Sequence, residues 1–215
     1  MGCKWSWVQI PPSRPFPFPG DFPIQESFAI LDILVTNDDG IDAPGIRALA
    51  EKLREVGEVT VVAPATEMSA VSHALTIHEP LRFEHVEQRM FRVEGTPADC
   101  VNLAVVKLLP KPPDIVVSGI NRGANVGDDI AYSGTVAGAR EAAMLGVPSM
   151  AVSLASKDGG ADYSHAAAFA AQILPVLAGK KDWSRRTFLN VNVPDSKVKG
   201  VRITSQGRRS SWTKV

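Results

Sequence analysis

The sequence predicts a single α/β domain whose sheet is mainly parallel and covered by helices on both faces. From Ile33 onward, short apolar strand patterns alternate with helical patterns, which is typical of parallel strands joined by helical crossovers. The chain of 215 residues is long enough for one domain with a sizeable core and short for two. Hydrophobic residues make up 45% of the chain and charged residues 21%, which is the composition of an ordinary globular protein.

The first elements are a strand and a helix. Residues 33–36 form a short buried-strand run with the sequence ILVT. A helix is expected over 45–56, because four apolar residues recur at helical spacing and Gly57 stands where a residue just past a helix end should. These four residues are Ile46, Leu49, Ala50 and Leu53.

The next segment contains a strand and a less regular region. The β-branched run at 59–63 predicts the second strand. Residues 75–93 have the pattern of short strands, and Pro80 disfavours a central position in the sheet. We therefore expect a local antiparallel excursion here.

A second helix is expected to begin at Thr96, whose hydroxyl can cap it. Pro97 suits the first helical position, and Asp99 puts an acid in the first turn. Apolar residues at helical spacing continue this helix to Leu108. The remaining elements are expected as a strand at 115–118, a helix over 135–145 ended by Gly146, a strand at 149–153, a helix over 164–177, and strands at 188–193 and 201–204.

The two ends of the chain differ from the domain, which is expected to span residues 31–207. Residues 1–30 are rich in proline and aromatic residues without helical or alternating periodicity, so they are expected to form an irregular arm. Too few apolar residues follow Lys4 for a secretory signal. The opening MGCKWS matches a myristoylation pattern, although an extended appendage is the simpler interpretation. Residues 208–215 form a short tail.

Composition excludes several classes of protein. Lysine plus arginine and aspartate plus glutamate number 23 each, so no overall positive field favours binding to a nucleic-acid duplex. No stretch approaches the ~18 to 20 apolar residues of a membrane span, so no membrane association is expected. The cysteines, Cys3 and Cys100, do not offer a disulfide framework, which favours a cytoplasmic location.

Three loops after predicted strands carry polar residues. In an open parallel sheet, ligands bind beyond the carboxyl ends of the strands. Asp38 and Asp39 follow the first strand in the sequence NDDG, although Asp and Gly are also common in simple turns. The loop at 67–73 is rich in hydroxyl groups, and the loop at 118–125 carries two asparagines. If these strands are neighbours, the oxygen donors suit Mg²⁺ or Mn²⁺ better than zinc.

Ser133, Gly134 and Thr135 open a predicted helix. Free backbone N–H groups and the helix dipole make such a start a potential anion site, although an ordinary N-cap explains the same residues. A divalent-metal set and a phosphate site in one chain together suggest phosphoryl chemistry.

Six motifs taken together resemble the survival protein E (SurE) family of metal-dependent nucleotidases. They are NDDG after ILVT, VVAP followed by E-x-S-A, GTPADC, SGINxGxN, SGTVxGAxEA and LNVNVP, and they run from about Ile33 to Gln206. The resemblance implies a Rossmann-like three-layer domain. It also implies hydrolysis of nucleoside 5′- and 3′-monophosphates, possible activity on short-chain polyphosphate, and one divalent metal ion per subunit, Mg²⁺ or Mn²⁺.

The resemblance assigns roles by position. The implied metal ligands are Asp38, Asp39, Ser69 and Asn121. The implied phosphate-binding residues are Asn125, Ser133, Gly134 and Thr135, and the implied catalytic residues are Asp38, Asp39 and Asn125. The residue pattern alone does not distinguish Ser69 from Ser72 as a ligand.

Several alternatives stay open at this point. The chain stops soon after QGRR, where members of the family usually continue, so we expect a homodimer in place of a tetramer. The same shortening leaves a catalytically impaired nucleotide-binding or scaffold protein as the alternative function. His73 is either an acid–base group or a surface residue, and Arg122 is either a phosphate donor or part of a structural ion pair. A dehydrogenase is disfavoured, because no GxGxxG follows the first strand.

Overall fold

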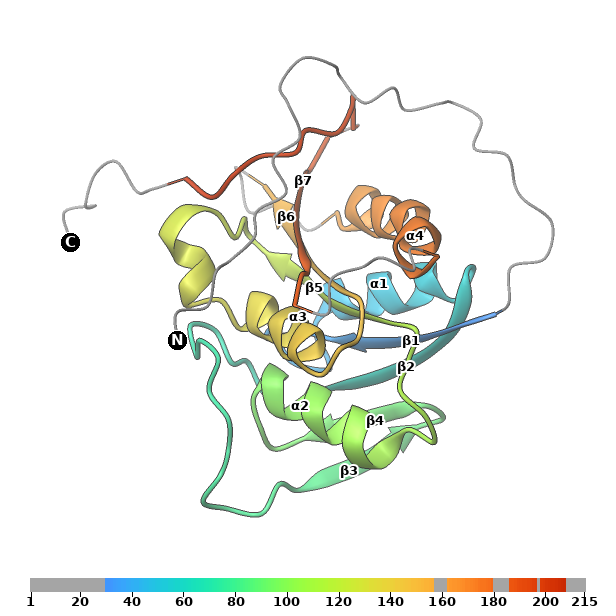
Figure 1. Ribbon diagram of the computed structural model, residues 1–215, viewed down its shortest axis with the longest axis vertical. Coiled ribbons are helices and arrows are strands. Elements are labelled where there is room, and N and C mark those ends of the chain that lie inside the picture. Colours follow the sequence, from blue (N-terminus) through green and yellow to red (C-terminus); the bar gives the residue numbers. More distant parts are fainter. Residues whose placement is uncertain (1–29, 157–161, 180–185, 197, 208–215) are drawn as a thin grey trace.

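A single twisted sheet lies between two layers of helices in the computed structural model, which describes residues 30–156, 162–179, 186–196 and 198–207 (Figure 1). The seven strands are β1 (Leu31–Thr36), β2 (Gly57–Pro64), β3 (Phe83–Glu87), β4 (Met90–Val93), β5 (Ile115–Arg122), β6 (Ser149–Ala155) and β7 (Leu189–Pro194), in the order β3-β4-β2-β1-β5-β6-β7. All neighbours are parallel except the antiparallel pair β3 and β4. The predicted α/β class and the local antiparallel excursion are confirmed.

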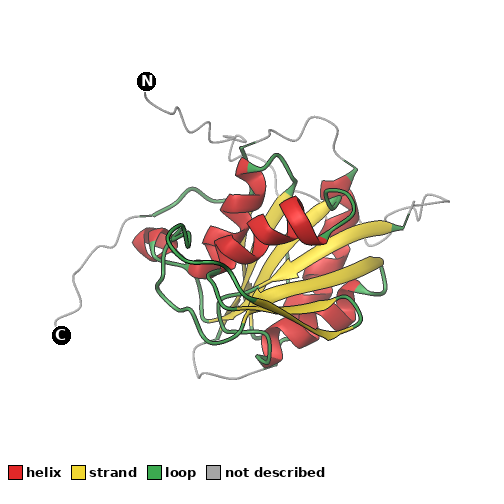
Figure 2. Ribbon diagram, turned by 90° about the horizontal axis from the view of Figure 1, so that it is seen from below, coloured by secondary structure: helices red, strands yellow, loops and turns green. Residues whose placement is uncertain are grey.

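The helices cover both faces of the sheet (Figure 2). They are α1 (Pro44–Leu53), α2 (Pro97–Leu103), α3 (Gly134–Met144) and α4 (Ser164–Ala178), with a π-helical turn η1 (Ala104–Leu108) and a 3-10 turn η2 (Gly127–Ala131). Successive side chains of β1 enter opposite cores, as strand geometry requires. Ile33 and Val35 pack in the core with α1 and α4, and Leu34 packs in the core with α2.

The direction in which the chain leaves the sheet changes at the central strand β1. The chain runs from β1 to β2 on one side and returns later to β5 on the other side of β1. Segments that leave adjacent parallel strands in opposite directions open a crevice between the strand tips. NDDG follows β1 and Asn121 lies near the end of β5, so the topology brings these motifs to one place.

Two predicted features near the sheet were wrong. Helix α1 ends at Leu53, and Gly57 is the first residue of β2, not the residue that follows a helix. A Cβ at Gly57 would lie 2.4 Å from the carbonyl oxygen of Leu31, so glycine is needed for close pairing with β1. The predicted strand at 201–204 is absent, because this segment pairs with no described strand and Val201 and Ile203 are exposed to solvent.

Strand β5 is longer than its apolar run indicates. It continues through Ser118 to Arg122, so Asn121 lies within the strand and not in the predicted loop at 118–125. The register with β6 shifts between Gly119 and Asn121, which is a β-bulge of the kind that redirects side chains near functional sites.

The helix starts follow the sequence closely. Thr96 caps α2 through its side chain, and Asp99 returns a hydrogen bond to the Thr96 backbone in a full capping box. Gly146, just beyond α3, has φ of 83°, a left-handed conformation suited to glycine. The predicted arm at 1–30, apart from Ile30, and the tail at 208–215 lie outside the described residues, as does Cys3.

Candidate active site

Asp38, the first carboxylate after β1, is 3% exposed and is held by the start of α3. The Thr135 hydroxyl donates to its Oδ1 through a short hydrogen bond, and the backbone of Thr135 and Gly134 adds further hydrogen bonds. Burial raises the pKa of Asp38 above its usual value, and these hydrogen bonds oppose that shift. Thr135 therefore fixes the orientation of a carboxylate at the tip of the central strand.

Asp39 lies beside Asp38 and faces the end of β5. The backbone N–H of Arg122 donates to its Oδ2 at 3.3 Å. Burial, followed by repulsion from Asp38, raises the pKa of Asp39 to about 6, and Glu67 adds to the repulsion. Two neighbouring carboxylates that repel each other in a partly buried site favour a bound cation.

Ser69 lies on the long loop after β2, and this loop is joined to the NDDG segment. The backbone N–H of Met68 donates to the carbonyl oxygen of Asp38 at 2.7 Å. The Ser69 hydroxyl donates to Glu67 at 2.8 Å and keeps its lone pairs for another partner. Ser72 instead donates from its backbone and hydroxyl to the carbonyls of Tyr132 and Ala131. Each hydroxyl donates one hydrogen bond, so the choice of Ser69 over Ser72 as a ligand stays a prediction.

Asn121 and Asn125 are held by different parts of the sheet. The Asn121 amide nitrogen donates to the carbonyl of Gly123 at 2.8 Å, which orients its side chain at the end of β5. The Asn125 amide nitrogen donates to Ser153 at 2.8 Å, and the Asn125 backbone N–H donates to Asn192 at 2.8 Å. Asn190 and Asn192 also donate to the Asn125 carbonyl.

Asn190 and Asn192 hold the Asn125 loop in place, a role that their sequence motif did not predict. They are the two asparagines of LNVNVP, and their spacing puts them on one face of β7. Alternating asparagines within an otherwise apolar strand were the available signal. Their amides both donate to the Asn125 carbonyl and so fix the loop that carries Asn125.

Gly134 lies directly against Asp38. A Cβ at this position would be 2.7 Å from the Cβ of Asp38 and 3.1 Å from the carbonyl oxygen of Met68. Ser133 caps α3, since its hydroxyl accepts from the Val136 N–H at 3.1 Å. The N-cap explanation is therefore confirmed for Ser133, whereas phosphate binding by Ser133, Gly134 and Thr135 stays a prediction.

The remaining polar candidates have defined surroundings. His73 contacts Glu141, with its Nε2 2.7 Å from the carboxylate. The Arg122 backbone binds Asp39, and phosphate binding by its side chain stays a prediction.

The family model for "Survival protein SurE" matches residues 33–213 of this chain. This chain belongs to the SurE family. Among curated relatives, it is 58% identical over 182 residues to the 5′-nucleotidase SurE of Geobacter sulfurreducens, covering 83% of this chain and 69% of that protein. It is 54% identical to the 5′-nucleotidase SurE of Geotalea uraniireducens, covering 84% and 73%. The crystal structure of the SurE protein from Aquifex aeolicus aligns with a TM-score of 0.77 and 43% identity, covering 83% of this chain and 73% of that one.

The donor set of this SurE chain fits a divalent cation. Among the described residues, no group of three or more His, Cys, Asp and Glu side chains is placed to hold a metal. A metal site at the β1 tip would therefore combine the Asp38–Asp39 pair with neutral oxygen donors. Such a set suits a hard cation and not zinc.

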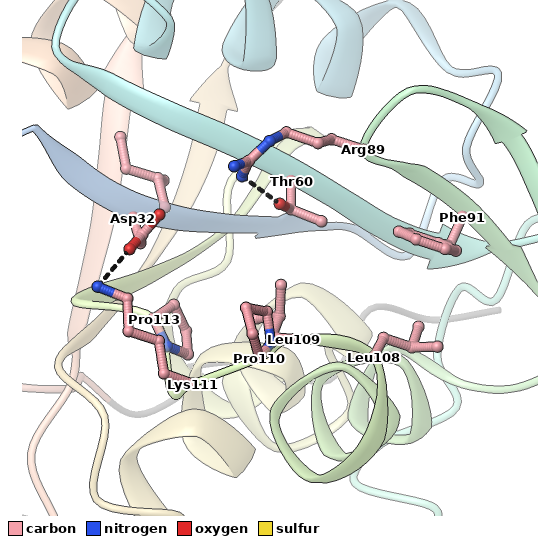
Figure 3. A pocket seen from close by; sticks show the side chains of 10 residues that line it. Asp32, Thr60, Arg89, Phe91, Leu108, Leu109, Pro110, Lys111 and Pro113 are labelled. Atoms are coloured by element: carbon pink, nitrogen blue, oxygen red, sulfur yellow. Dashed lines mark hydrogen bonds and ion pairs between the residues drawn. The ribbon is translucent and has the colours of Figure 1, made fainter.

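A separate pocket lies at the other end of the sheet, where β1 begins (Figure 3). Its two cationic side chains already have partners. Lys111 forms an ion pair with Asp32 at 2.7 Å, and Arg89 contacts Thr60 and Glu58. This pocket does not belong to the candidate active site.

No helix among the described parts of the chain is both long and apolar enough to cross a membrane.

Proposed function

We propose that this protein is a hydrolase, a metal-dependent phosphomonoesterase that converts nucleoside 5′- and 3′-monophosphates to nucleoside and phosphate. The observation that carries this proposal is the Asp38–Asp39 pair at the tip of β1, in which Asp38 is hydrogen-bonded to the start of α3 and Asp39 to the end of β5. Curated relatives that match over most of this chain bear the name 5′-nucleotidase. Short-chain polyphosphate is a further substrate to test.

Asp38, Asp39, Ser69 and Asn121 would hold one divalent ion, Mg²⁺ or Mn²⁺. When bound, such an ion supplies Lewis-acid chemistry, neutralising charge on phosphoryl oxygens and lowering the pKa of water. Thr135 contributes by fixing Asp38, which reduces the reorganisation needed for binding.

The residues proposed to receive the phosphate are held in place before substrate arrives. Asn190 and Asn192 hold the backbone of Asn125, and Ser153 accepts a hydrogen bond from its side-chain amide. The start of α3 offers a positive dipole end beside the carboxylates. Donors fixed in advance stabilise a developing negative charge without the cost of reorganisation.

The test is phosphate release from a panel of nucleoside 5′- and 3′-monophosphates, with Mg²⁺, with Mn²⁺ and with chelator. We expect metal-dependent release by the wild type and a loss of about 100-fold or more in Asp39→Asn. Asp42→Asn is the matched control, because Asp42 is an exposed acid paired with Arg47 and Arg92. Equal activity of all three proteins, or activity unaffected by chelator, would overturn the proposal.

The impaired-scaffold alternative is not favoured, because the relatives that match most of the chain are named as enzymes. The cytoplasmic location and the homodimer stay predictions. Light scattering on the purified chain tests the second.

A further inference from the structure

We infer that His73 and Glu141 are positioning residues that hold the Ser69 loop against helix α3 and thereby set the affinity for the divalent cation. This inference rests on the proposed function, since it concerns the same metal site. It starts from the loop itself, which runs without helix or strand from residue 65 to residue 82.

The stretch around Ser69 cannot be held by its own local geometry. Ala70 and Ser72, on either side of Val71, both have φ of 58°, a left-handed conformation that costs energy for residues other than glycine. Ser69 itself is exposed. A strained, exposed segment persists only where its surroundings over-determine it, so the contacts of the loop with the rest of the fold decide where Ser69 lies.

Glu141 is one of two buried acids among these contacts, the other being Asp99, which binds Thr76. Glu141 is 4% exposed, and both of its carboxylate oxygens are used. Oε2 lies 2.7 Å from Nε2 of His73, and Oε1 accepts from the Asn102 amide at 3.0 Å. The hydrogen bond with His73, together with the Asn102 hydrogen bond, outweighs the opposing effect of burial and leaves the pKa of Glu141 below its usual value, so the group is an anion that orients its partners.

Helix α3 connects this contact to the carboxylate pair. Thr135, in the first turn of α3, hydrogen-bonds Asp38, and Glu141 lies about 9 Å farther along the same helix. His73 follows Ser69 by four residues. One rigid helix therefore holds Asp38 at one point and the Ser69 loop at another, which fixes the separation of two proposed ligands.

The contact with Glu141 uses one ring nitrogen of His73, Nε2, and the His73 side chain is 18% exposed. Positioning and proton transfer predict different effects of removing this side chain, because a group that transfers a proton to substrate acts on kcat. Supporting residues that orient metal ligands typically change metal affinity 10- to 100-fold when removed.

The experiment compares four variants: Glu141→Ala, Glu141→Gln, His73→Ala and Gly146→Ala. Glu141→Gln keeps the shape and an oxygen acceptor for His73. His73→Ala removes the same contact by changing its less buried partner, so the Glu141 side chain stays in place on α3. This variant keeps the test valid if Glu141→Ala folds poorly. Gly146→Ala is the matched control, because Gly146 ends the same helix with φ of 83° and a Cβ there meets nothing within 4 Å.

Two measurements separate positioning from mere stability: the Mn²⁺ dissociation constant by calorimetry, and amide hydrogen exchange of residues 66–76 in chelator. We expect Glu141→Ala and His73→Ala each to raise the Mn²⁺ dissociation constant about 10- to 100-fold and to speed loop exchange. Glu141→Gln should stay within a few-fold of wild type, and Gly146→Ala should lose stability without either effect.

Two results would overturn the inference. One is a wild-type Mn²⁺ constant and wild-type loop exchange in both alanine variants. The other is loss of kcat in His73→Ala with unchanged Mn²⁺ affinity, which would make His73 a group that acts on substrate. Failure of the proposed function is distinct, because the wild type itself would then show no metal-dependent phosphatase activity, and loop exchange would still report whether Glu141 holds the loop.

Discussion

Replacing Gly134 by alanine perturbs the candidate site at its most crowded point. The added methyl group would lie 2.7 Å from the Cβ of Asp38, 3.0 Å from its Oδ2 and 3.1 Å from the carbonyl oxygen of Met68. An ordinary contact needs at least 3.4 Å, so Asp38 or the helix start must move by about 0.7 Å (3.4 minus 2.7). Neither neighbour is the end of a flexible side chain, which leaves no inexpensive relaxation.

The expected effects follow from this displacement. Overpacking of this kind costs about 1–3 kcal/mol of unfolding free energy. For a chain of this size, each kcal/mol lowers Tm by about 2–4 °C, so a fall of about 2–12 °C is expected. A misplacement of about 1 Å in a catalytic group costs on the order of 100-fold in rate, so kcat should fall by about 10- to 100-fold.

The assay pairs thermal unfolding with steady-state hydrolysis of a nucleoside monophosphate. Gly146→Ala is the control at the other end of α3, since it is strained at φ of 83° but crowds nothing. It should lose about 1 kcal/mol and keep its kcat. If Gly134→Ala keeps wild-type kcat, or if the two variants lose activity in proportion to stability, then the contact between Gly134 and Asp38 does not set the geometry of the site.

Three further predictions concern other positions. Burial and a neighbouring carboxylate raise the pKa of Asp39 from 3.8 to about 6, so between these pH values the folded state binds a proton that the unfolded state has lost. The stability of the metal-free protein should therefore fall as the pH rises from 3.8 to about 6. In chelator at pH 7.5, Asp39→Asn should therefore melt above wild type, and added Mn²⁺ should raise only the wild-type Tm; a variant that melts lower in chelator would contradict this sign. Gly119→Ala should cost about 3 kcal/mol or more of unfolding free energy in urea, because φ is 142° and the added Cβ would lie 2.3 Å from the carbonyl oxygen of Val152. Gly123→Ala is the control, with φ of 112° and open space around the added Cβ, and should cost about 1 kcal/mol. Equal losses in the two variants would refute the role of crowding. Asp99→Ala should cost about 2 kcal/mol by the same measurement, since that carboxylate accepts two hydrogen bonds from Thr76 that join the Ser69 loop to the start of α2, and a third from the Thr96 backbone that caps α2. A loss below about 0.5 kcal/mol would show that these bonds are replaced by water.

The order and type of most elements were predictable because their signals are local. The cap of α2 depends on Thr96 and Asp99, which are three residues apart, and the structure forms that capping box. The apolar run of β1 and the glycine after α3 likewise act over a few residues. Family membership was also readable from the motifs, because each motif is a short stretch of consecutive residues.

Other features depended on contacts between distant parts of the chain. Residues 201–204 alternate like a strand but have no described partner strand, so they form none. Gly57 resembles a helix-ending glycine in sequence, yet its role comes from the carbonyl of Leu31, which lies on a neighbouring strand. Hydrogen-bond partners and close approaches of this kind arise only when the sheet assembles.

The candidate site shows the same division. The sequence by itself determined which loops carry oxygen donors, because residues after parallel strands gather at one edge of the sheet. Only the tertiary structure decided how those donors are held: Thr135 against Asp38, the asparagines of β7 against Asn125, and Glu141 against His73, across separations of 97, 65, 67 and 68 residues. The physical reason is that a hydrogen bond depends on distance and angle in space, and no pattern of neighbouring residues encodes a contact between segments that far apart.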